Sequence, residues 1–565
     1  MAEKITGAEA LMRALEHEGV TTLFGYPGGA IMPTYDALYD HKTTLNHVLV
    51  RHEQGAVHAA QGYARVSGQV GCAIVTSGPG ATNTITGVAD AMIDSTPIVV
   101  ICGQVGVAML GTDAFQEVDV VGVTQPVSKW SYQIRRAEDV AWAVSRAFFI
   151  AKNGRPGPVV LDFAKNAQTG MVDYEPANVD FIRSYDPYPK MDKENIKRAA
   201  QMINNSVKPF ALIGQGVELG NACDEVKTFL EKAQIPFGTT FLGLSALPSD
   251  HPLNMGILGM HGNLGPNVMT NQCDLLIAIG MRFDDRVTGN LATYAKQAKI
   301  IHFDIDDAEF NKNVKVDIAI HANCKESVPA VTALIDEARH DSWISGFKPY
   351  AEKEYSKVIS HAIHPTEGDL LMGGVVNKVT EATHNQAIMV TDVGQNQLFA
   401  CRYFKFSKPR SVVTSGGMGT MGFGLPAAIG ATYGAPERTV CMFCGDGGLQ
   451  MTIQELGTIM EHGAPVKIIL LNNNYLGNVR QWQDMFWGGR RSFTRMHNPQ
   501  YGLIARGYGI GYELVTERDT LAAAIGRMLS AEGPFLLECA VLEEDNVLPM
   551  TAPGKRVDEM KLTLS

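Results

Sequence analysis

Short apolar runs alternate with helical segments along the whole chain. Each run is rich in Val, Ile and Leu and is followed by glycine or polar residues, as buried parallel strands are. Between the runs, apolar residues recur at intervals of three and four, which predicts helices. This alternation is typical of parallel sheets with helices on both faces. The clearest runs are GCAIV, PIVVICG and PVVLDFA, then PFALIG, DLLIAIG and KIIHFDI, and finally AIMVTDVG, RTVCMFCG and VKIILLNN.

Two segments interrupt this alternation and divide the chain. Residues 171–192 are rich in Pro, Asp and Tyr, and residues 341–365 are polar and end at a proline, so both are predicted to be linkers. We therefore expect an α/β protein of three doubly wound parallel-sheet domains, each of ordinary single-domain size. The expected domains are residues 1–170, 193–340 and 366–565.

Composition and charge narrow the functions that the chain can have. Of its 565 residues, 45% are hydrophobic and 19% are charged, which suits large buried cores. The formal net charge of −11, without a basic block, argues against binding to nucleic acid or to an anionic membrane. No apolar run reaches the ~20 residues of a membrane span. The N-terminus, MAEKITGAEALMRALEHEG, is predicted to be an amphipathic helix rather than a targeting signal, so we expect a cytoplasmic protein.

The nine cysteines are scattered, and several lie in strand-like runs, where reduced and buried thiols are usual. Cys441 and Cys444 form a CxxC pair, which leaves a metal or redox site as the less favoured alternative. Alternating side chains of a strand point to opposite faces, so we expect these two thiols to lie on different sides of a sheet.

Two glycine-containing turns begin with the same three residues. TSGPGATNTITGVADA (76–91) and TSGGMGTMGFGLPAAIGA (414–431) both place TSG and further glycine before a helix of small residues. Both are expected at the carboxyl ends of strands, where open α/β sheets bind ligands. We interpret the pair as a weak internal duplication.

An acidic residue follows one of the predicted central strands. Asp446 lies in CGDGG, between the strand RTVCMFC and a helical segment. Asn473 follows the next predicted strand, and a single crossover helix places the ends of neighbouring parallel strands side by side. Buried carboxylates need a cationic partner, and Mg²⁺ prefers oxygen ligands shared with phosphates. The alternatives are a divalent cation with a diphosphate or, for GDG alone, an Asx-type cap.

GDG followed by NN one helix and one strand later resembles the signature of thiamine-diphosphate-dependent enzymes. This resemblance implies that Asp446, Asn473 and the main-chain carbonyl of Tyr475 bind Mg²⁺. It also implies that the first domain binds the pyrimidine, that the third binds the diphosphate, and that Gly419 and Met421 hold the bent coenzyme. The other implied cofactor residues are Val393, Gly394, Gln395, Gly445, Gly447 and Gly448.

The segment RHEQGAVHAAQGYARVSG resembles the family's activating-glutamate segment. Glu53 would then hydrogen-bond the pyrimidine ring, which needs a carboxyl group far from the phosphates. An ordinary carboxylate at a helix N-terminus, favoured by the helix dipole, is the alternative. Glu53 belongs to the first domain and Asp446 to the third. The resemblance implies that the cofactor lies between two chains, so a homodimer is the smallest expected unit.

Over nearly its whole length, the chain most resembles the catalytic subunits of acetohydroxyacid synthases, also called acetolactate synthases. The resemblance implies decarboxylation of pyruvate on thiamine diphosphate and condensation of the hydroxyethyl enamine with a second 2-keto acid. Pyruvate as acceptor gives 2-acetolactate, and 2-ketobutyrate gives 2-aceto-2-hydroxybutyrate, the first common step of branched-chain amino acid biosynthesis. The segments that carry it are FGYPGGAIMPTYDAL, GTDAFQEVDVVG, RPGPVVLDFAKNAQ, LGMHG, RFDDRVTGN and YLGNVRQWQDMFW.

The same resemblance assigns catalytic and substrate-binding residues. Gly29 and Gln116 would stabilise developing oxyanions, Arg286 would bind the carboxylate of the acceptor, and Trp482 would favour the larger acceptor. A packed aromatic residue of the core is the alternative for Trp482. Lys165, within RPGPVVLDFAKNAQ, completes the catalytic set.

A second cofactor is implied for the central domain. LIGQG, RFDDR, IHFDID and Arg155 resemble the FAD site of acetohydroxyacid synthases. FAD would be structural, because the net reaction moves no electrons. The candidate residues are Arg155, Gly214, Gly216, Met260, His261, Gly280, Arg282, Asp284, Arg286, Asp304, Asp306 and Asn323.

The rivals are an FAD-free catabolic acetolactate synthase, a pyruvate oxidase-like enzyme and a cofactor-binding protein without activity. RFDDR and Trp482 argue against the first two, and intact Glu53, Asp446 and Asn473 against the third. The resemblance also implies a small regulatory subunit as a partner. The chain departs from the family pattern at Gly106, Asn396, Asn478 and Ala322-Asn323.

Overall fold

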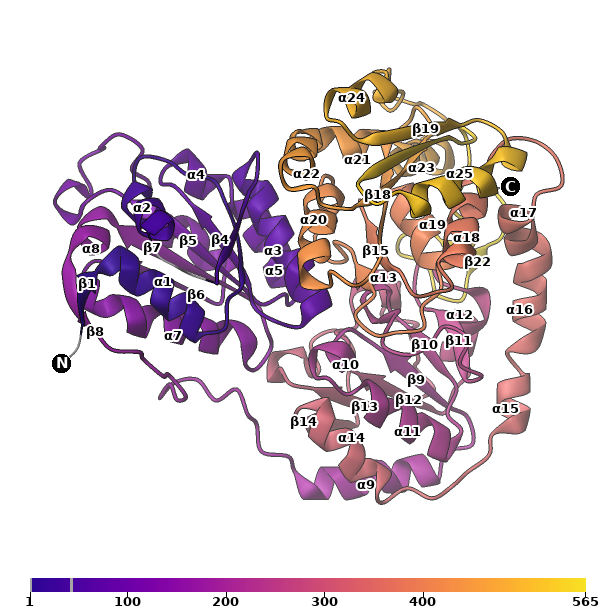
Figure 1. The fold of residues 1–565 in the computed structure, drawn as a ribbon. Coiled ribbons are helices and arrows are strands. Elements are labelled where there is room, and N and C mark those ends of the chain that lie inside the picture. Colours follow the sequence, from indigo (N-terminus) through magenta and orange to yellow (C-terminus); the bar gives the residue numbers. More distant parts are fainter. Residues whose placement is uncertain (1–2, 41–43, 565) are drawn as a thin grey trace.

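The computed structural model describes residues 3–40 and 44–564 and contains three six-stranded parallel sheets, each flanked by helices (Figure 1). This confirms the predicted α/β class. In Figure 1 the first domain lies on the left, the central domain below and the third domain at the upper right. Within the described ranges, no helix is long and apolar enough to cross a membrane.

The first domain is built on a sheet with the strand order β3-β2-β4-β5-β7-β6, in which all pairs are parallel. Its strands are β2 (Thr22–Gly25), β3 (Asn46–Leu49), β4 (Gly71–Val75), β5 (Ile98–Gln104), β6 (Trp130–Ile134) and β7 (Pro158–Ala164). Its helices are α1 (Gly7–His17), α2 (Met32–Asp40), α3 (Glu53–Ser67), α4 (Pro79–Thr82), α5 (Ile85–Ile93), α6 (Val120–Thr124), α7 (Val140–Lys152) and α8 (Lys165–Thr169).

The central domain has the strand order β11-β10-β9-β12-β13-β14, again parallel throughout. Its strands are β9 (Pro209–Ile213), β10 (Phe237–Thr239), β11 (Asn254–Ile257), β12 (Leu275–Ile279), β13 (Lys299–Asp304) and β14 (Ile318–His321). Its helices are α9 (Lys193–Asn204), α10 (Gly216–Leu219), α11 (Cys223–Ala233), α12 (Leu264–Thr270), α13 (Asp285–Thr288) and α14 (Cys324–Thr332).

The third domain has the strand order β16-β15-β17-β18-β20-β19, with parallel pairs throughout. Its strands are β15 (Ile388–Thr391), β16 (Val412–Val413), β17 (Val440–Gly445), β18 (Lys467–Asn472), β19 (Gly511–Val515) and β20 (Phe535–Ala540). Its helices are α18 (Met372–Ala382), α19 (Gln395–Tyr403), α20 (Gly424–Gly434), α21 (Asp446–Met451), α22 (Leu456–His462), α23 (Gly477–Phe486), α24 (Tyr501–Gly507) and α25 (Arg518–Ser530).

The segments predicted as linkers differ from each other in structure. The first begins with β8 (Met171–Tyr174), which pairs with β1 (Glu3–Thr6) in an antiparallel ribbon, and then runs below the molecule to α9 (Figure 1). The second is helical and climbs from the central to the third domain as α15 (Asp341–Ser345), α16 (Lys348–Glu354), a π-helical turn (Tyr355–Ile359) and α17 (Ser360–Ile363). After β20, the chain forms a small antiparallel ribbon of β21 (Met550–Thr551) and β22 (Met560–Lys561). The domain boundaries drawn from the sequence stay a prediction.

Strand β17 shows why the CxxC pair does not form a joint thiol site. Cys441 packs with Phe443 in the apolar core on one face of the sheet, and Cys444 packs with Met442 in the core on the other. All nine cysteines are free thiols in the described chain, and eight are buried. The period of two along a strand therefore separates the thiols, as the sequence predicted.

The first and third domains of one chain meet through α3 and α20, which lie side by side in Figure 1. Glycine permits this close contact. A β-carbon at Gly430 would lie 1.8 Å from the carbonyl oxygen of Ala59, and one at Gly62 would lie 2.0 Å from that of Ala427. Any larger residue at these positions would push the two helices, and with them the two domains, apart.

Candidate active site

The carboxyl ends of β17 and β18 bring two predicted metal ligands together. The strands pair in parallel with Gly445 opposite Leu471, so Asp446 and Asn473 follow neighbouring strand ends. Asp446 is only 1% exposed and Asn473 only 2%. The two strand ends therefore lie side by side, as the crossover topology predicted, and both residues that follow them are buried.

Asn498, which the sequence analysis missed, joins this edge of the sheet. Its side-chain nitrogen donates to Asp446 Oδ2 at 2.6 Å, to Asn472 Oδ1 at 3.0 Å and to Asn474 Oδ1 at 3.1 Å. The residue comes from a loop far along the chain, in the unremarkable sequence MHNPQ, which carries no motif signal. It holds three oxygen-bearing side chains within one hydrogen-bonded cluster.

The carboxyl of Asp446 lies in an environment that disfavours its charge. Burial raises its pKa to about 6, although Asn498 and backbone amides partly oppose this. Its described hydrogen-bond partners are neutral. A buried carboxyl, an amide oxygen and main-chain carbonyls are hard oxygen donors, so this group of residues fits a divalent cation.

Two helices begin at the same edge, because β15 and β17 are adjacent strands. Helix α19 follows Gly394, whose φ of +117° favours glycine, and α21 starts at Asp446 itself. A β-carbon at Gly447 would lie 2.7 Å from Leu476 Cδ2, so a larger residue there would require the Leu476 side chain to shift. Amides at helix N-termini bind phosphate groups well, and this edge therefore fits a diphosphate next to the cation.

Asp392 is a second residue that the sequence analysis missed. Its carboxylate accepts the amides of Val393 at 2.8 Å, Gly422 at 3.0 Å and Gly424 at 3.0 Å. Burial raises its pKa. The bonds to Gly422 and Gly424 fix the backbone on the C-terminal side of Met421, so Asp392 orients the loop expected to bend the coenzyme. Asp392 lies in TDVGQ, directly after an apolar strand, and an acid at the end of a buried strand is a sequence signal that could have identified it as a candidate site residue.

A cavity of about 810 Å³ opens where all three domains meet. Gly214 lies behind its wall, where a β-carbon would come 2.2 Å from the carbonyl oxygen of Gly280. Asp306 is likewise absent from the described lining. The predicted site residues that line the cavity are Arg155, Gly216, Met260, His261, Gly280, Arg282, Asp284, Arg286, Asp304, Asn323, Val393, Gly394, Gly419 and Trp482.

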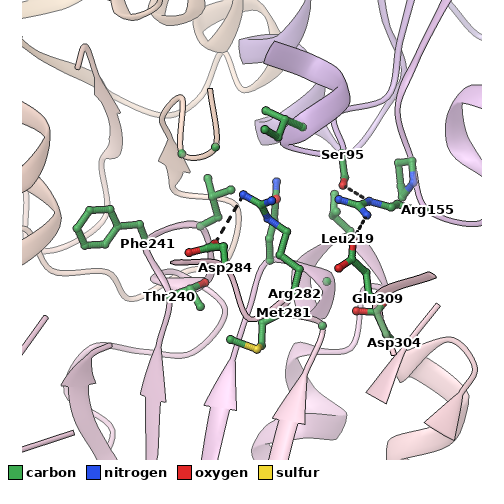
Figure 2. A pocket seen from close by; sticks show the side chains of 18 of the residues that line it. Ser95, Arg155, Leu219, Thr240, Phe241, Met281, Arg282, Asp284, Asp304 and Glu309 are labelled. Atoms are coloured by element: carbon green, nitrogen blue, oxygen red, sulfur yellow. Dashed lines mark hydrogen bonds and ion pairs between the residues drawn. The ribbon is translucent and has the colours of Figure 1, made fainter. Parts of the chain in front are cut away.

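Cationic and acidic side chains pair with each other along the wall of this cavity (Figure 2). Arg155 donates to Ser95 Oγ at 2.9 Å, to Asp306 at 3.1 Å and to Glu309 at 2.6 Å. Arg282 forms a longer ion pair with Asp284, at 3.6 Å. The buried Glu309 was not anticipated. Arginines with partly exposed side chains at the wall of a glycine-lined cavity suit a ligand with a diphosphate.

One contact joins the central and third domains at the mouth of the cavity. The guanidinium carbon of Arg286 lies 5.9 Å from the ring centroid of Trp482, and its Nη1 lies 3.5 Å from Met260 Sδ. The sequence assigned both Arg286 and Trp482 to the acceptor, although they are far apart in the chain. Their stacking places a cation and an aromatic face at one wall.

The first domain gathers a separate group of predicted residues. Glu53 begins α3 and accepts a hydrogen bond from Asn83 Nδ2 at 2.9 Å. A β-carbon at Gly80 would lie 3.5 Å from Glu53 Oε1, and one at Gly78 would lie 2.8 Å from the carbonyl oxygen of Gln116. The turn 76–80 thus connects Glu53 with Gln116. The hydroxyls of Thr76 and Ser77 in this turn are buried and have no described hydrogen-bond partner.

Arg155 of the first domain lines this cavity, but the predicted catalytic residues of that domain do not. Neither Glu53 nor Gln116 is among the described residues that line it, and the same holds for Gly29 and Lys165. Lys165 is exposed at the end of β7. Within one chain, Glu53 thus belongs to a group of residues in the first domain, and Asp446 belongs to a second group at the sheet edge of the third domain.

A residue of the third domain, Glu455, contacts the start of α3 in the same chain. The carboxylate of Glu455 accepts the amide of Arg51 at 3.2 Å, and a β-carbon at Gly55 would lie 2.5 Å from Glu455 Oε1. Burial raises the pKa of Glu455 to about 7. The sequence analysis missed this residue, because the contact depends on how the two domains dock.

Comparisons with known proteins agree with the arrangement of two terminal cofactor domains around a central one. The family description "Thiamine pyrophosphate enzyme, N-terminal TPP binding domain" matches residues 5–123, "central domain" matches 196–331, and "C-terminal TPP binding domain" matches 392–539. Thiamine pyrophosphate is the same compound as thiamine diphosphate.

Full-length relatives narrow this class. The chain is 41% identical over 563 residues to the acetolactate synthase isozyme 2 large subunit of Escherichia coli, covering 99% of this chain and 100% of the relative. It is 41% identical to the acetolactate synthase large subunit of Lactococcus lactis, over 98% of this chain and 96% of the relative. It is also 41% identical to the chloroplastic acetolactate synthase 1 of Nicotiana tabacum, over 97% of this chain and 83% of the relative. The chain therefore belongs to the thiamine pyrophosphate enzymes and, within them, to the acetolactate synthase large subunits.

Proposed function

We propose that this chain is the catalytic subunit of an acetohydroxyacid synthase. It releases CO₂ from pyruvate and joins the remaining two-carbon unit to a second 2-keto acid. With pyruvate as acceptor the product is 2-acetolactate, and with 2-ketobutyrate it is 2-aceto-2-hydroxybutyrate. The observation that carries this proposal is the convergence of buried Asp446 and Asn473 at one sheet edge, in a chain of this family.

Asp446, Asn473 and the carbonyl of Tyr475 are the proposed ligands of Mg²⁺, which would hold the diphosphate at the N-termini of α19 and α21. When bound, thiamine diphosphate would supply a nucleophilic ring carbon that adds to pyruvate and a thiazolium ring that can take up the electron pair left as CO₂ is lost. The further proposed cofactor contacts come from the edge described above and the loop beside it: Val393, Gly394, Gln395, Gly419, Met421, Gly445, Gly447 and Gly448.

Glu53 is proposed to exchange a proton with the pyrimidine ring of a cofactor held by a second copy of the chain. Two observations support a site shared between chains. Glu53 lies outside the cavity that Gly419 lines, and the two buried hydroxyls beside it have no described partner within the chain. A homodimer is then the smallest active unit, with two equivalent sites.

The acceptor is proposed to lie near the stacked pair of Arg286 and Trp482. The planar guanidinium suits the carboxylate of a 2-keto acid, and the indole offers apolar contact for the extra methyl of 2-ketobutyrate. Gly29, Gln116 and Lys165, from the first domain, are the proposed groups that approach from the other chain and stabilise developing negative charge.

FAD is the proposed occupant of the cavity between the domains. Arg155 and Arg282 supply positive charge for its diphosphate. Gly216 and Gly280 also line the cavity, and because neither has a side chain, a ligand can approach their backbone. The two glycines are packed so closely that a β-carbon at Gly216 would lie 2.6 Å from Gly280 Cα. The reaction moves no net electrons, so FAD is proposed to stabilise the arrangement of the domains. A small regulatory subunit is a further proposed partner, because relatives are called large subunits.

The test is an assay of the purified chain with pyruvate, thiamine diphosphate, Mg²⁺ and FAD, with each omitted in turn. We expect 2-acetolactate and CO₂, lost when either thiamine diphosphate or Mg²⁺ is absent. A competition between pyruvate and 2-ketobutyrate as acceptors then separates the proposal from a catabolic enzyme. No carboligation with all components present would overturn the proposal, and no preference for 2-ketobutyrate would favour the catabolic alternative.

A further inference from the structure

Two buried acids of the first domain hold the loop Ser415–Thr420, which we call the clamped loop. Asp90 lies on α5 and Asp94 ends it, and they are 0% and 1% exposed. Asp90 Oδ2 accepts the hydroxyls of Ser415 and Thr420, both at 2.5 Å. Asp94 accepts two amides of the same loop, from Gly416 at 2.8 Å and Gly417 at 2.7 Å. The loop therefore has acids on one side and the large cavity on the other, since Ser415–Gly419 line that cavity.

Among the residues that the structure describes, Arg65 is the cation that acts on these two acids, and it binds Asp94 directly. Arg65 of α3 donates to Asp94 Oδ2 at 2.8 Å, to the carbonyl of Thr414 and to the hydroxyl of Thr96. His58, also on α3, is neutral, because burial lowers its pKa to about 3. Asp94 thus has a cation and two amides, whereas Asp90 has hydroxyl donors. Burial raises the pKa of both carboxyls, and it is Asp90 that lacks a direct charged partner.

Two acceptors beside each other lack a donor. Asp90 Oδ1 and Gln61 Oε1 are both buried, and neither has a hydrogen-bond partner among the described residues. Gln61 lies beside the carboxyl of Asp90, where its side chain lowers the pKa of that carboxyl against the effect of burial. Its nitrogen already donates to the carbonyl of Gly87 at 3.1 Å and faces His58 Nδ1 at 3.1 Å. A buried acceptor without a donor is unfavourable, and one proton shared between these two oxygens would satisfy both.

We propose that Asp90 is a neutral carboxylic acid in the folded chain, with its proton on Oδ1 directed to Gln61, and that it positions the clamped loop. Asp90 touches no proposed cofactor residue itself and acts through Ser415 and Thr420. A second carboxylate here would repel Asp94, whereas a neutral acid accepts both hydroxyls without that cost. The functional part rests on the proposed function, which assigns Gly419 and Met421 to the cofactor. The first domain would then serve one cofactor through Glu53 and the other through this loop.

The decisive variants are Asp90→Asn and Asp90→Ala. An asparagine copies a neutral acid, because its oxygen can accept both hydroxyls and its amide can donate to Gln61. We expect Asp90→Asn to keep turnover and the half-saturating thiamine diphosphate concentration within about twofold of the parent. Asp90→Ala should raise that concentration roughly tenfold, which corresponds to about 1.4 kcal/mol, and lower turnover at saturating cofactor much less. If both variants are equally impaired, or both unimpaired, the proposal is overturned.

Infrared spectroscopy tests the proton itself, without activity. The difference spectrum between the parent chain and Asp90→Asn should show the carbonyl stretch of a protonated carboxyl at neutral pH, with no cofactor added. A carboxylate band in its place would overturn the proposal even for a fully active enzyme. Conversely, a parent chain that forms no 2-acetolactate would overturn the proposed function and leave the protonated band intact, so the two failures are distinguishable.

A second variant covers the case in which Asp90→Ala does not fold. Ser415→Ala combined with Thr420→Val removes the two hydroxyl donors and keeps the acid. We expect the same rise in the half-saturating cofactor concentration, with normal turnover at saturation. The matched control is Thr383→Val, whose hydroxyl bonds only to carbonyls at the end of α18, away from the cavity. Unchanged cofactor affinity in the double variant would contradict the positioning of the loop.

Discussion

The first and third domains are built on the same sheet, yet they carry different chemistry at the same edge. Numbered along each domain, their strands run 2-1-3-4-6-5 across the sheet, whereas the central domain runs 3-2-1-4-5-6. After its second strand the first domain has Glu53, and the third domain has the clamped loop. After its third strand the first domain has the turn 76–80, and the third domain has Asp446. One scaffold thus supplies an acid in one copy and the proposed metal-binding edge in the other.

This comparison corrects the duplication inferred from the two TSG turns. The first turn follows β4, the third strand of its domain, and the second follows β16, the second strand of its domain. They are therefore not counterparts in the repeated fold. The first and third domains repeat the same strand order. The shared TSG sequence instead reflects the small and polar residues that a tight turn from a strand into a helix favours. A repeated scaffold with diverged edges is what a site assembled from two unlike halves requires.

Removing the acid from the first-domain group should have the largest effect. Glu53→Gln keeps the size of the side chain but removes the carboxyl that exchanges a proton, so turnover should fall by roughly two to four orders of magnitude. Binding of thiamine diphosphate should persist, because the proposed diphosphate and metal contacts lie in the third domain. Steady-state kinetics and fluorescence titration with the cofactor measure the two quantities. Full turnover in this variant would show that the first-domain group does not activate the cofactor.

Removing the proposed metal ligand from the third-domain group should act on binding instead. Asp446→Ala should weaken thiamine diphosphate and Mg²⁺ binding by about a hundredfold, near 2.8 kcal/mol. Mixing it with Glu53→Gln under conditions that exchange subunits sharpens the comparison. If each site joins the first domain of one chain to the third domain of another, mixed dimers regain one intact site and about a quarter of the parent activity. No recovery from mixtures that have demonstrably exchanged would place the site within one chain.

How much the sequence predicted depends on how local each contact is. Asp446 and Asn473 could be brought together because one crossover helix fixes where neighbouring parallel strands end. Asn498 could not, because it reaches the same edge from a loop that no periodicity places. Asp90 and Glu455 each bind residues of the other docked domain, and these partners lie hundreds of positions away. Motif spacing predicts the ends of strands, whereas residues that position them from a neighbouring domain become visible only in the structure.

The contact between the two domains can be tested through its close helix packing. Gly430→Ala places a β-carbon 1.8 Å from the carbonyl oxygen of Ala59, so α3 and α20 must separate. We expect a loss of about 1–3 kcal/mol in the free energy of unfolding, as for other overpacked cores. Gly526→Ala is the matched control, because this helical glycine has nothing within 4 Å, and it should be neutral or gain about 0.5–1 kcal/mol. Denaturant titration measures both, and equal stability of the two variants would contradict a tight contact.

The smallest expected effect concerns the carboxyl that holds the start of α3. Glu455 has a folded-state pKa of about 7, raised from 4.5 by burial, so the folded chain binds more protons than the unfolded chain between these values. Its contribution to stability is therefore largest below pH 4.5, falls as the pH rises toward 7 and is level above that. Glu455→Gln should remove this part of the pH dependence while keeping an acceptor for the Arg51 amide. Unfolding free energies measured at several pH values test this, and an unchanged slope in the variant would mean that Glu455 is charged throughout. In that case α3, and with it Glu53, would be held by a carboxylate rather than by a neutral acid.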